Sequence, residues 1–310
     1  MFIKPRYESV ELRVLRSLNN RLELADKKRN YYLNFEKGYA GEKKFDEWMG
    51  GFFRDNWLIL NDLLLENKNS VFQIDSLLIT SQKIYLFEIK NYDGDFYIED
   101  NKWYTFSGTE INNPFSQLER CESSFKALLH EIGYNILIEP YVIFINPNFF
   151  LYQAPQKSPL IFPSQLNKLK NNLLMNKSPL NKRHFRIAEK LTSLHLKESP
   201  YTRLPKYEYN MLEKGVTCKV CYSFVDHISI EKGKKIIVCK NCSYKESINS
   251  AVLRSTLEYK LLFPDRKITT NDIFDWCKEI NSKRAIRRIL ANRYKHTGHG
   301  KYSYFIKNDD

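Results

Sequence analysis

The chain has 310 residues, of which 43% are hydrophobic and 27% are charged. These proportions indicate a globular protein of two or three domains and exclude a disordered chain, a coiled-coil rod and a collagen-like fibre. No apolar run reaches the ~18–20 residues of a transmembrane helix, and residues 1–6 contain no apolar signal core. We therefore expect a cytoplasmic protein that does not bind membranes.

The net charge of +13 is unevenly distributed along the chain. It is −4 over residues 1–154, +7 over 155–200 and +10 over 201–310. A basic back half is typical of proteins that bind polyanions such as nucleic acid. An acidic front half provides the carboxylates that hard metal ions prefer.

In chain order, the sequence of the front half predicts a helix, several strands, another helix and a further strand. Apolar residues at helical spacing predict an amphipathic helix over 8–29. Gly38 and Gly41 indicate a break, after which residues 42–49 are expected to form a second helix. Asn113-Pro114 is a typical cap and first turn of a helix that runs to His130. We expect strands over 58–65, 71–80, 83–90, 96–98, 103–106 and 141–145, and shorter helices over 166–174 and 184–196, which together make a mixed α/β domain.

Two carboxylates lie on neighbouring predicted strands. If the chain turns tightly so that Thr80 faces Lys83, the same register sets Asp75 directly across from Glu88. Such a pair with apolar flanks costs free energy unless a cation lies between the carboxylates. A divalent ion there would activate a water molecule, and Lys90, on the same face as Glu88, would orient that water or stabilise developing charge. The alternative is a surface pair of solvated charges.

Further motifs surround this hairpin in a fixed order. They are Gly38-Tyr39-Ala40-Gly41-Glu42, Gln73-Ile74-Asp75, Glu88-Ile89-Lys90-Asn91-Tyr92 with Gly94, Trp103, and Asn113-Pro114-Phe115-Ser116-Gln117. Over roughly residues 35–150 they closely resemble the nuclease-related domain (NERD) family, which is similar to restriction-endonuclease-like PD-(D/E)xK nucleases. The proline that often precedes the aspartate in the wider superfamily is replaced here by Ile74.

The resemblance implies a restriction-endonuclease-like mixed sheet flanked by helices. It also implies an active site formed by Glu42, Asp75, Glu88, Lys90 and Gln117, in which Asp75 and Glu88 bind Mg²⁺ or Mn²⁺. Two of these residues also fit ordinary structural roles. A carboxylate at the start of a helix, as predicted for Glu42, is favoured by the helix dipole, and Gln117 on an inward stripe could make an ordinary buried hydrogen bond.

Four cysteines in the back half form two Cys-x2-Cys pairs. Cys218 and Cys221 are followed, after 17 residues, by Cys239 and Cys242. This spacing predicts a zinc ribbon in which four thiolates hold a structural Zn²⁺. Two disulfides are the alternative, but a cytoplasmic protein rarely forms them.

The C-terminal region reads as three short helices and a hairpin that contains glycine. This order resembles a winged helix-turn-helix, in which the third helix contacts DNA. On that helix Arg284, Arg287 and Arg288 lie opposite the apolar face, and Lys301 follows in the hairpin. We expect these four residues to contact nucleic acid. The alternative is a solvated basic helix on an ordinary helical domain.

The expected organisation is an N-terminal amphipathic helix over 1–34, a nuclease-like domain over 35–200, a zinc ribbon over 210–248 and a winged-helix-like basic domain over 250–310. The favoured function is a metal-dependent nuclease that hydrolyses phosphodiester bonds and binds nucleic acid, DNA in the first instance, through its tail. The alternative is a non-catalytic DNA-binding or scaffold protein built on an inactive nuclease fold. The complete set of expected active-site residues favours the nuclease.

Overall fold

The computed structural model describes residues 1–175, 178–225, 228–231 and 234–307, with the backbone alone for 228–231, 234–235 and 301. The chain forms two compact units. Unit 1 comprises Met1–Ser9 and Leu33–Thr202, and unit 2 comprises Val10–Tyr32 and Arg203–Asp310. Among the described residues, every helix is too short or too polar to pass through a bilayer.

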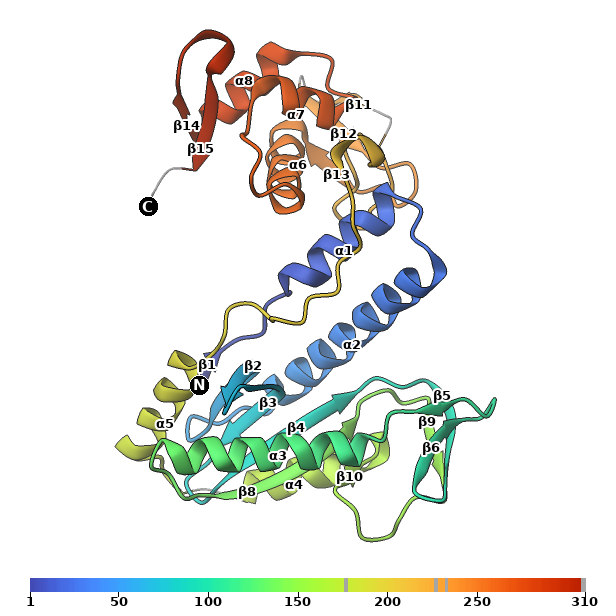
Figure 1. The fold of residues 1–310 in the computed structure, drawn as a ribbon, viewed down its shortest axis with the longest axis vertical. Helices are drawn as coiled ribbons and strands as arrows, with labels where there is room; N and C mark the ends of the chain where they lie inside the picture. The colour runs from blue at the N-terminus through green and yellow to red at the C-terminus, as the bar shows by residue number, and fades with distance from the viewer. Residues whose placement is uncertain (176–177, 226–227, 232–233, 308–310) are drawn as a thin grey trace. The chain divides into compact units, whose positions relative to one another are not determined.

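Unit 1 is built on a six-stranded mixed sheet (Figure 1). Its strand order is β1-β2-β3-β4-β8-β10, with antiparallel pairing for β2-β3 and β3-β4 and parallel pairing elsewhere. The strands are β1 (Phe2–Lys4), β2 (Leu58–Asn67), β3 (Ser70–Ile79), β4 (Lys83–Lys90), β8 (Leu137–Phe144) and β10 (Leu160–Ile161).

Helices cover both faces of this sheet. One face packs against α3 (Pro114–Glu131) and α5 (Lys182–Ser193), and the other packs against α2 (Asp26–Gly50) and α4 (Leu166–Met175). Successive side chains of β4 point to opposite faces of the sheet, which explains the two layers. Ile84 and Leu86 pack in the α3 layer, whereas Tyr85 and Phe87 pack in the α2 layer. Glu88 and Lys90 therefore continue the row that faces α3.

A second, four-stranded sheet extends unit 1 in the order β7-β6-β5-β9. One of its faces contributes Phe96, Trp103 and Phe149 to the α3 layer of the core. Its strands are β5 (Gly94–Glu99), β6 (Lys102–Thr105), β7 (Glu110–Ile111) and β9 (Phe149–Tyr152), and a 3-10 turn, η1 (Pro163–Gln165), precedes α4.

The helices before the sheet differ from the prediction. The single helix expected over 8–29 is replaced by α1 (Val10–Arg21) and the start of α2, and the break expected at Gly38 and Gly41 is absent because α2 continues through both. Gly41 has a packing role instead, since a Cβ added there would lie 2.4 Å from Asn91 Cβ. The glycine permits close approach of helix and strand, and burial of Phe45 and Met49 offsets its low helix propensity of about 1 kcal/mol.

Unit 2 contains α1, a three-stranded sheet in the order β11-β12-β13, three helices and a hairpin. Its further elements are η2 (Tyr209–Met211), β11 (Ile228–Glu231), β12 (Lys234–Val238), β13 (Lys245–Ser247), α6 (Ile248–Leu262), α7 (Thr270–Cys277), α8 (Lys283–Ala291), β14 (Tyr294–Thr297), η3 (Gly300–Tyr302) and β15 (Tyr304–Lys307). Ser282 caps α8 by accepting a bond from the Ala285 amide, and Thr269 caps α7 by accepting a bond from the Asp272 amide.

A buried arginine ties α1 to the rest of unit 2. The Arg21 side chain is fully buried and pairs with Glu258 at 2.8 Å. It also donates to the carbonyl oxygens of Glu213 and Gly215, and its guanidinium lies 4.2 Å from the ring centre of Trp276. The expected fold class, a mixed sheet flanked by helices followed by a four-cysteine module and a small helical domain, is confirmed.

Candidate active site and metal centre

The register predicted for the central hairpin agrees with the structure. Ser76 pairs with Phe87 and Ile79 pairs with Ile84, the alignment that places Asp75 opposite Glu88. The regular ladder between β3 and β4 ends at this point. Instead of a backbone bond, Asp75 Oδ2 accepts a hydrogen bond of 2.8 Å from the Ile89 amide. A carboxylate thus takes the place of a strand carbonyl where the two strands stop pairing.

Glu88, Lys90 and Gln117 form a compact hydrogen-bonded network. Lys90 Nζ donates to Glu88 Oε1 at 2.8 Å and to Gln117 Oε1 at 2.9 Å. The amide of Gln117 returns a bond of 2.5 Å to the same Glu88 oxygen. Glu88 is 2% exposed. The inward orientation predicted for Gln117 on α3 is what brings its amide to the ends of the strands.

Three carboxyl groups in this region ionise less readily than usual. Burial raises the pKa of Glu88 to about 7, and the charge of Asp75 adds to the rise while Lys90 opposes it. Burial also raises the pKa of Asp75, against the opposing effects of Lys90 and the Ile89 amide. For Glu42 on α2, burial and then the charge of Asp75 raise the pKa to about 8. Burial is the main reason why these carboxyl groups are costly to ionise.

The N-terminal segment brings two buried cations to this region that no sequence pattern indicates. Arg6 donates to Glu42 Oε2 at 2.6 Å, to both oxygens of Asp46, and to the Asp75 carbonyl oxygen at 2.7 Å. Lys4 donates to the carbonyl oxygens of Asn61 and Asp62. Arg6 is the partner of Glu42, which lies deep within α2 and not at a helix start as predicted. A stabilising role of Glu42 toward the helix dipole is therefore wrong.

Asp62 is a further carboxylate beside Asp75 that the sequence analysis did not identify. Asn61 pairs with Ser76 and Leu63 pairs with Ile74, so the register places Asp62 opposite Asp75. Its backbone is left-handed, with φ of 55°, in the middle of β2. This conformation is strained for a residue other than glycine. The sequence feature that could have drawn attention to Asp62 is the polar pair Asn61-Asp62, which interrupts an otherwise apolar strand.

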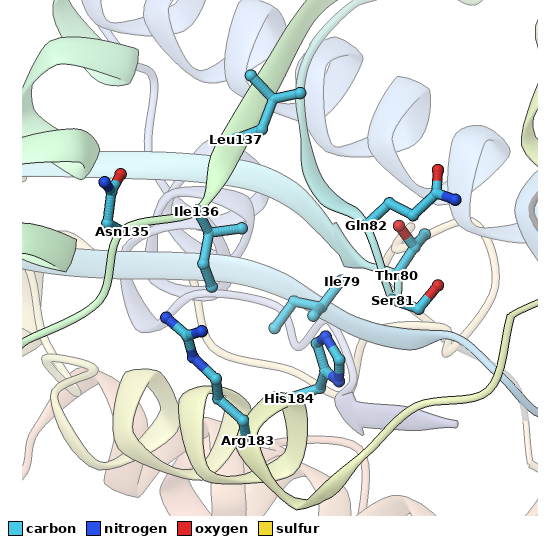
Figure 2. A pocket seen from close by; sticks show the side chains of 9 residues that line it. All are labelled: Ile79, Thr80, Ser81, Gln82, Asn135, Ile136, Leu137, Arg183 and His184. Carbon is cyan, nitrogen blue, oxygen red and sulfur yellow. The ribbon is translucent and has the colours of Figure 1, made fainter.

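The carboxylates are not gathered into a ready-made three-ligand site. Among the described residues, only the four cysteines bring three or more candidate metal ligands close enough for one ion. A separate cavity of about 190 Å³ lies at the turn end of the same hairpin (Figure 2), and neither Asp75 nor Glu88 lines it. Its lining combines that turn with the start of α5: Ile79, Thr80, Ser81, Gln82, Asn135, Ile136, Leu137, Arg183 and His184.

The four cysteines of unit 2 converge as predicted. Their sulfur atoms all lie within 4.8 Å of one another, with 3.6 Å between Cys218 and Cys242 and 3.4 Å between Cys221 and Cys239. Tetrahedral coordination with Zn–S bonds of ~2.3 Å requires sulfur separations of ~3.8 Å. The cluster thus has the dimensions of a four-thiolate metal site.

The two Cys-x2-Cys loops have matching backbones. The Cys218 amide donates to the Ser223 carbonyl, and the Cys239 amide donates to the Tyr244 carbonyl five residues later in the same way. The fourth residue after each first cysteine donates back to that cysteine's carbonyl and is left-handed: Tyr222 with φ of 61° and Ser243 with φ of 59°. Two equivalent loops therefore present two sulfurs each.

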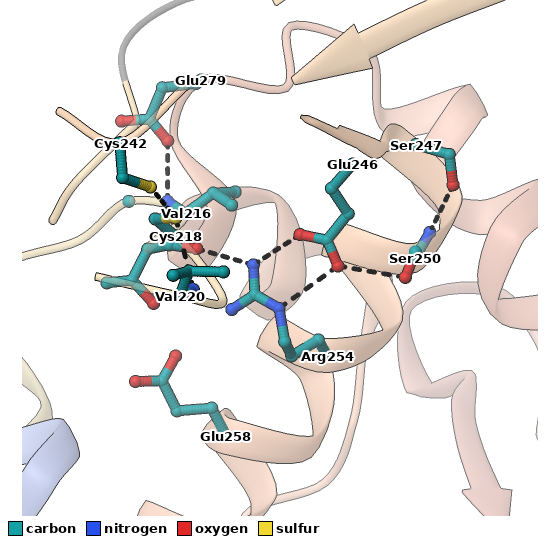
Figure 3. Close-up of polar contacts among 12 residues, drawn as sticks. Val216, Cys218, Val220, Cys242, Glu246, Ser247, Ser250, Arg254, Glu258 and Glu279 are labelled. Carbon is teal, nitrogen blue, oxygen red and sulfur yellow. Dashed lines mark hydrogen bonds and ion pairs between the residues drawn. The ribbon is translucent and has the colours of Figure 1, made fainter. Parts of the chain in front are cut away.

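Polar contacts anchor the first loop to α6 (Figure 3). Arg254 donates to the Thr217 carbonyl at 2.6 Å and pairs with Glu246 at 2.8 Å. Glu279 accepts the Val216 amide at 2.9 Å. These bonds fix the segment before Cys218 through contacts that do not use the cysteine side chains.

The basic residues predicted to contact nucleic acid lie on α8. Arg284, Arg287 and Arg288 are exposed, while Ile286, Ile289 and Leu290 of the same helix are buried. The side chain of Lys301 lies outside the described part of the chain, so its predicted role stays a prediction. After α8 the chain forms the β14–β15 hairpin, as expected of a winged-helix-like tail.

Comparison with known proteins identifies part of the chain. Residues 37–145 match the family model described as the nuclease-related domain (NERD). Searches of curated proteins and of solved structures each find no match. All five expected active-site residues fall inside the matched segment, whereas Arg6 lies outside it.

Proposed function

We propose that unit 1 is a metal-dependent nuclease that hydrolyses phosphodiester bonds, and that unit 2 binds the nucleic acid, DNA in the first instance. The observation that carries this proposal is the network of Lys90, Gln117 and Glu88 beside Asp75 within the segment that matches the NERD family model. An ammonium, an amide and two carboxylates at one strand end are the groups that phosphodiester hydrolysis needs.

Asp75 and Glu88 fit the role of ligands for Mg²⁺ or Mn²⁺. In the hydrogen bonds of the described residues, Asp75 uses only Oδ2 and Glu88 uses only Oε1, so each carboxylate keeps one oxygen without a protein donor. Mg²⁺ is commonly held by one or two carboxylates, with water and substrate phosphate completing its shell. The ion would supply charge stabilisation and a more acidic water. Glu42 is the third expected residue and is held by Arg6.

The protein groups have distinct parts in this proposal. Lys90 places a positive charge beside the carboxylate pair, where it can stabilise negative charge that develops on phosphate. Gln117 holds both Lys90 and Glu88 and so fixes the distance between them. The partly shielded position of this network, with the Lys90 side chain 15% exposed, strengthens these interactions relative to bulk water.

We further propose that the four cysteines hold one structural Zn²⁺. Matched loops, sulfur separations near those of tetrahedral coordination, and a module too small for a large core all support this proposal. Four thiolates leave no open position, so the metal would stabilise unit 2 without taking part in hydrolysis.

The direct test is incubation of the purified full chain with plasmid DNA, linear DNA and RNA in the presence of Mg²⁺ or Mn²⁺. We expect cleavage of at least one substrate by the native chain and none by Glu88→Gln, prepared in parallel. If no substrate is cleaved while nucleic acid is still bound, the non-catalytic DNA-binding protein becomes the better assignment.

A further inference from the structure

A basic groove lies between α8 and the turn that follows β14. Its volume is about 480 Å³, a size that accommodates small-molecule ligands. Both elements belong to unit 2, so the groove is complete within one compact part of the chain. The lining consists of cationic, imidazole, hydroxyl and glycine residues: Thr270, Lys283, Arg284, Arg287, His296, Gly298, His299, Gly300 and Ser303.

The described residues that line the groove include three cations and no carboxylate. On one helix, Arg287 lies three residues after Arg284 and four residues after Lys283, spacings at which like charges repel. Among the described residues, neither Arg284 nor Arg287 forms an ion pair, and Lys283 Nζ lies 5.2 Å from the centre of the Phe274 ring. An anion would relieve this repulsion.

The opposite wall supplies further donors. The His296 ring packs against the Phe305 ring in a T-shaped arrangement, with ring centres 5.2 Å apart. Gly298 permits the turn to close, because its φ is +78° and an added Cβ would lie 2.8 Å from the Tyr302 carbonyl oxygen. His299 and the glycines of this turn line the groove together with the cations of α8.

We propose that this groove binds the terminal phosphate monoester at a nucleic-acid end. A phosphodiester within a strand carries one negative charge, whereas a terminal phosphate approaches two and presents three oxygens. Three cations and two imidazoles around one concavity match the terminal group, and Arg side chains are suited to paired bonds with phosphate oxygens. Arg288 is exposed on the same helix but does not line the groove. The proposal rests on the proposed nucleic-acid-binding role of unit 2 and adds to it a preference for phosphorylated ends.

The test measures binding of the full chain to one short fluorescent DNA duplex made with a 5′-phosphate, with a 3′-phosphate or with hydroxyl ends. Glu88→Gln protein is used without added Mg²⁺, Mn²⁺ or chelator, so that neither cleavage nor loss of zinc intervenes. We expect one phosphorylated probe to bind roughly tenfold more tightly than the hydroxyl probe, as charge-assisted bonds to phosphate require. Inorganic phosphate should compete for that difference.

Two variants distinguish phosphate binding in the groove from general electrostatic attraction to nucleic acid. In Arg284→Ala/Arg287→Ala the preference for the phosphorylated end should disappear. In the matched control Arg288→Ala, affinity should fall equally for all probes while the preference persists. Equal binding of all probes by the Glu88→Gln protein, or a preference that survives the double substitution, overturns the groove proposal and leaves the nuclease proposal intact. If no probe binds at all, the nucleic-acid-binding role of unit 2 fails as well.

Discussion

Arg6 links two expected active-site residues: its Nη1 lies 2.6 Å from Glu42 Oε2, and its Nη2 lies 2.7 Å from the Asp75 carbonyl oxygen. The Arg6 side chain is 3% exposed. Although burial opposes its charge, Glu42 and Asp46 raise the Arg6 pKa, so the guanidinium remains protonated. Arg6 therefore holds α2 against β3.

Replacing Arg6 should change the pH profile of cleavage. Arg6 opposes the rise in the Glu42 pKa, so Arg6→Gln should raise that pKa further and move the acidic limb of the profile to higher pH. Arg6→Lys, which keeps the charge, should move it less. Lys43→Ala, an exposed cation on the same helix, is the control and should leave the profile unchanged. A loss of activity by the same factor at every pH would indicate a purely structural role for Arg6.

Lys90 and Glu88 should be required for cleavage and dispensable for binding. Lys90→Ala removes a preorganised charge, which typically costs ~10²–10³ in rate, and Glu88→Gln should cost at least as much. Single-turnover cleavage and fluorescence anisotropy measure the two properties separately. Glu66→Gln, an exposed carboxylate on β2, serves as the control with native activity. Cleavage at the native rate by Glu88→Gln would place the chemistry elsewhere.

The raised pKa of Glu88 predicts how stability depends on pH when no divalent ion is added. The unfolded chain ionises Glu88 near ~4.3, whereas the folded chain does so at about 7. Between these values the folded state binds the additional proton, so the free energy of unfolding should fall as pH rises from about 4 to 7. Thermal unfolding should show a steeper decline for the native chain than for Glu88→Gln, in which only the raised pKa values of Asp75 and Glu42 still contribute. Added Mg²⁺ should oppose the decline by stabilising the ionised form.

Zinc content should depend on the four cysteines of unit 2 alone. Protein purified without chelator should contain one zinc per chain, and Cys239→Ser should lose it together with the ordered structure of its loop. Cys121→Ser, a substitution in unit 1, should retain one zinc. Elemental analysis measures the number of zinc ions per chain. A native chain without zinc would contradict the metal assignment.

The strained loop residue Ser243 offers a stability test that does not involve activity. It is exposed and left-handed, with φ of 59°, so Ser243→Gly should raise the free energy of unfolding of unit 2 by about 1 kcal/mol. Ser243→Ala retains the strain and should give no gain. Thermal unfolding in the presence of zinc measures the difference.

The hairpin register and the cysteine cluster could be predicted because both follow from short-range patterns. Strand alternation placed Glu88 and Lys90 on one face, and the tight turn set Asp75 opposite Glu88. Pattern alone could not reveal Arg6, because its partner Glu42 is 36 residues away and neither residue belongs to a shared motif. The continuous α2 was missed for a related reason, since the close contact of Gly41 with Asn91 exists only in the folded unit.

Each compact unit is assembled from two separate stretches of chain, and this has consequences for dissecting the protein. Residues 10–32 belong to unit 2 although they are preceded by β1 and Arg6 of unit 1. No single cut can therefore release either unit whole. A fragment of residues 203–310 would lack α1 and leave Glu258 without Arg21. A fragment of residues 33–202 would lose Arg6 and expose Glu42. Isolating either unit requires a rejoined chain, such as residues 1–9 connected by a short linker to residue 33.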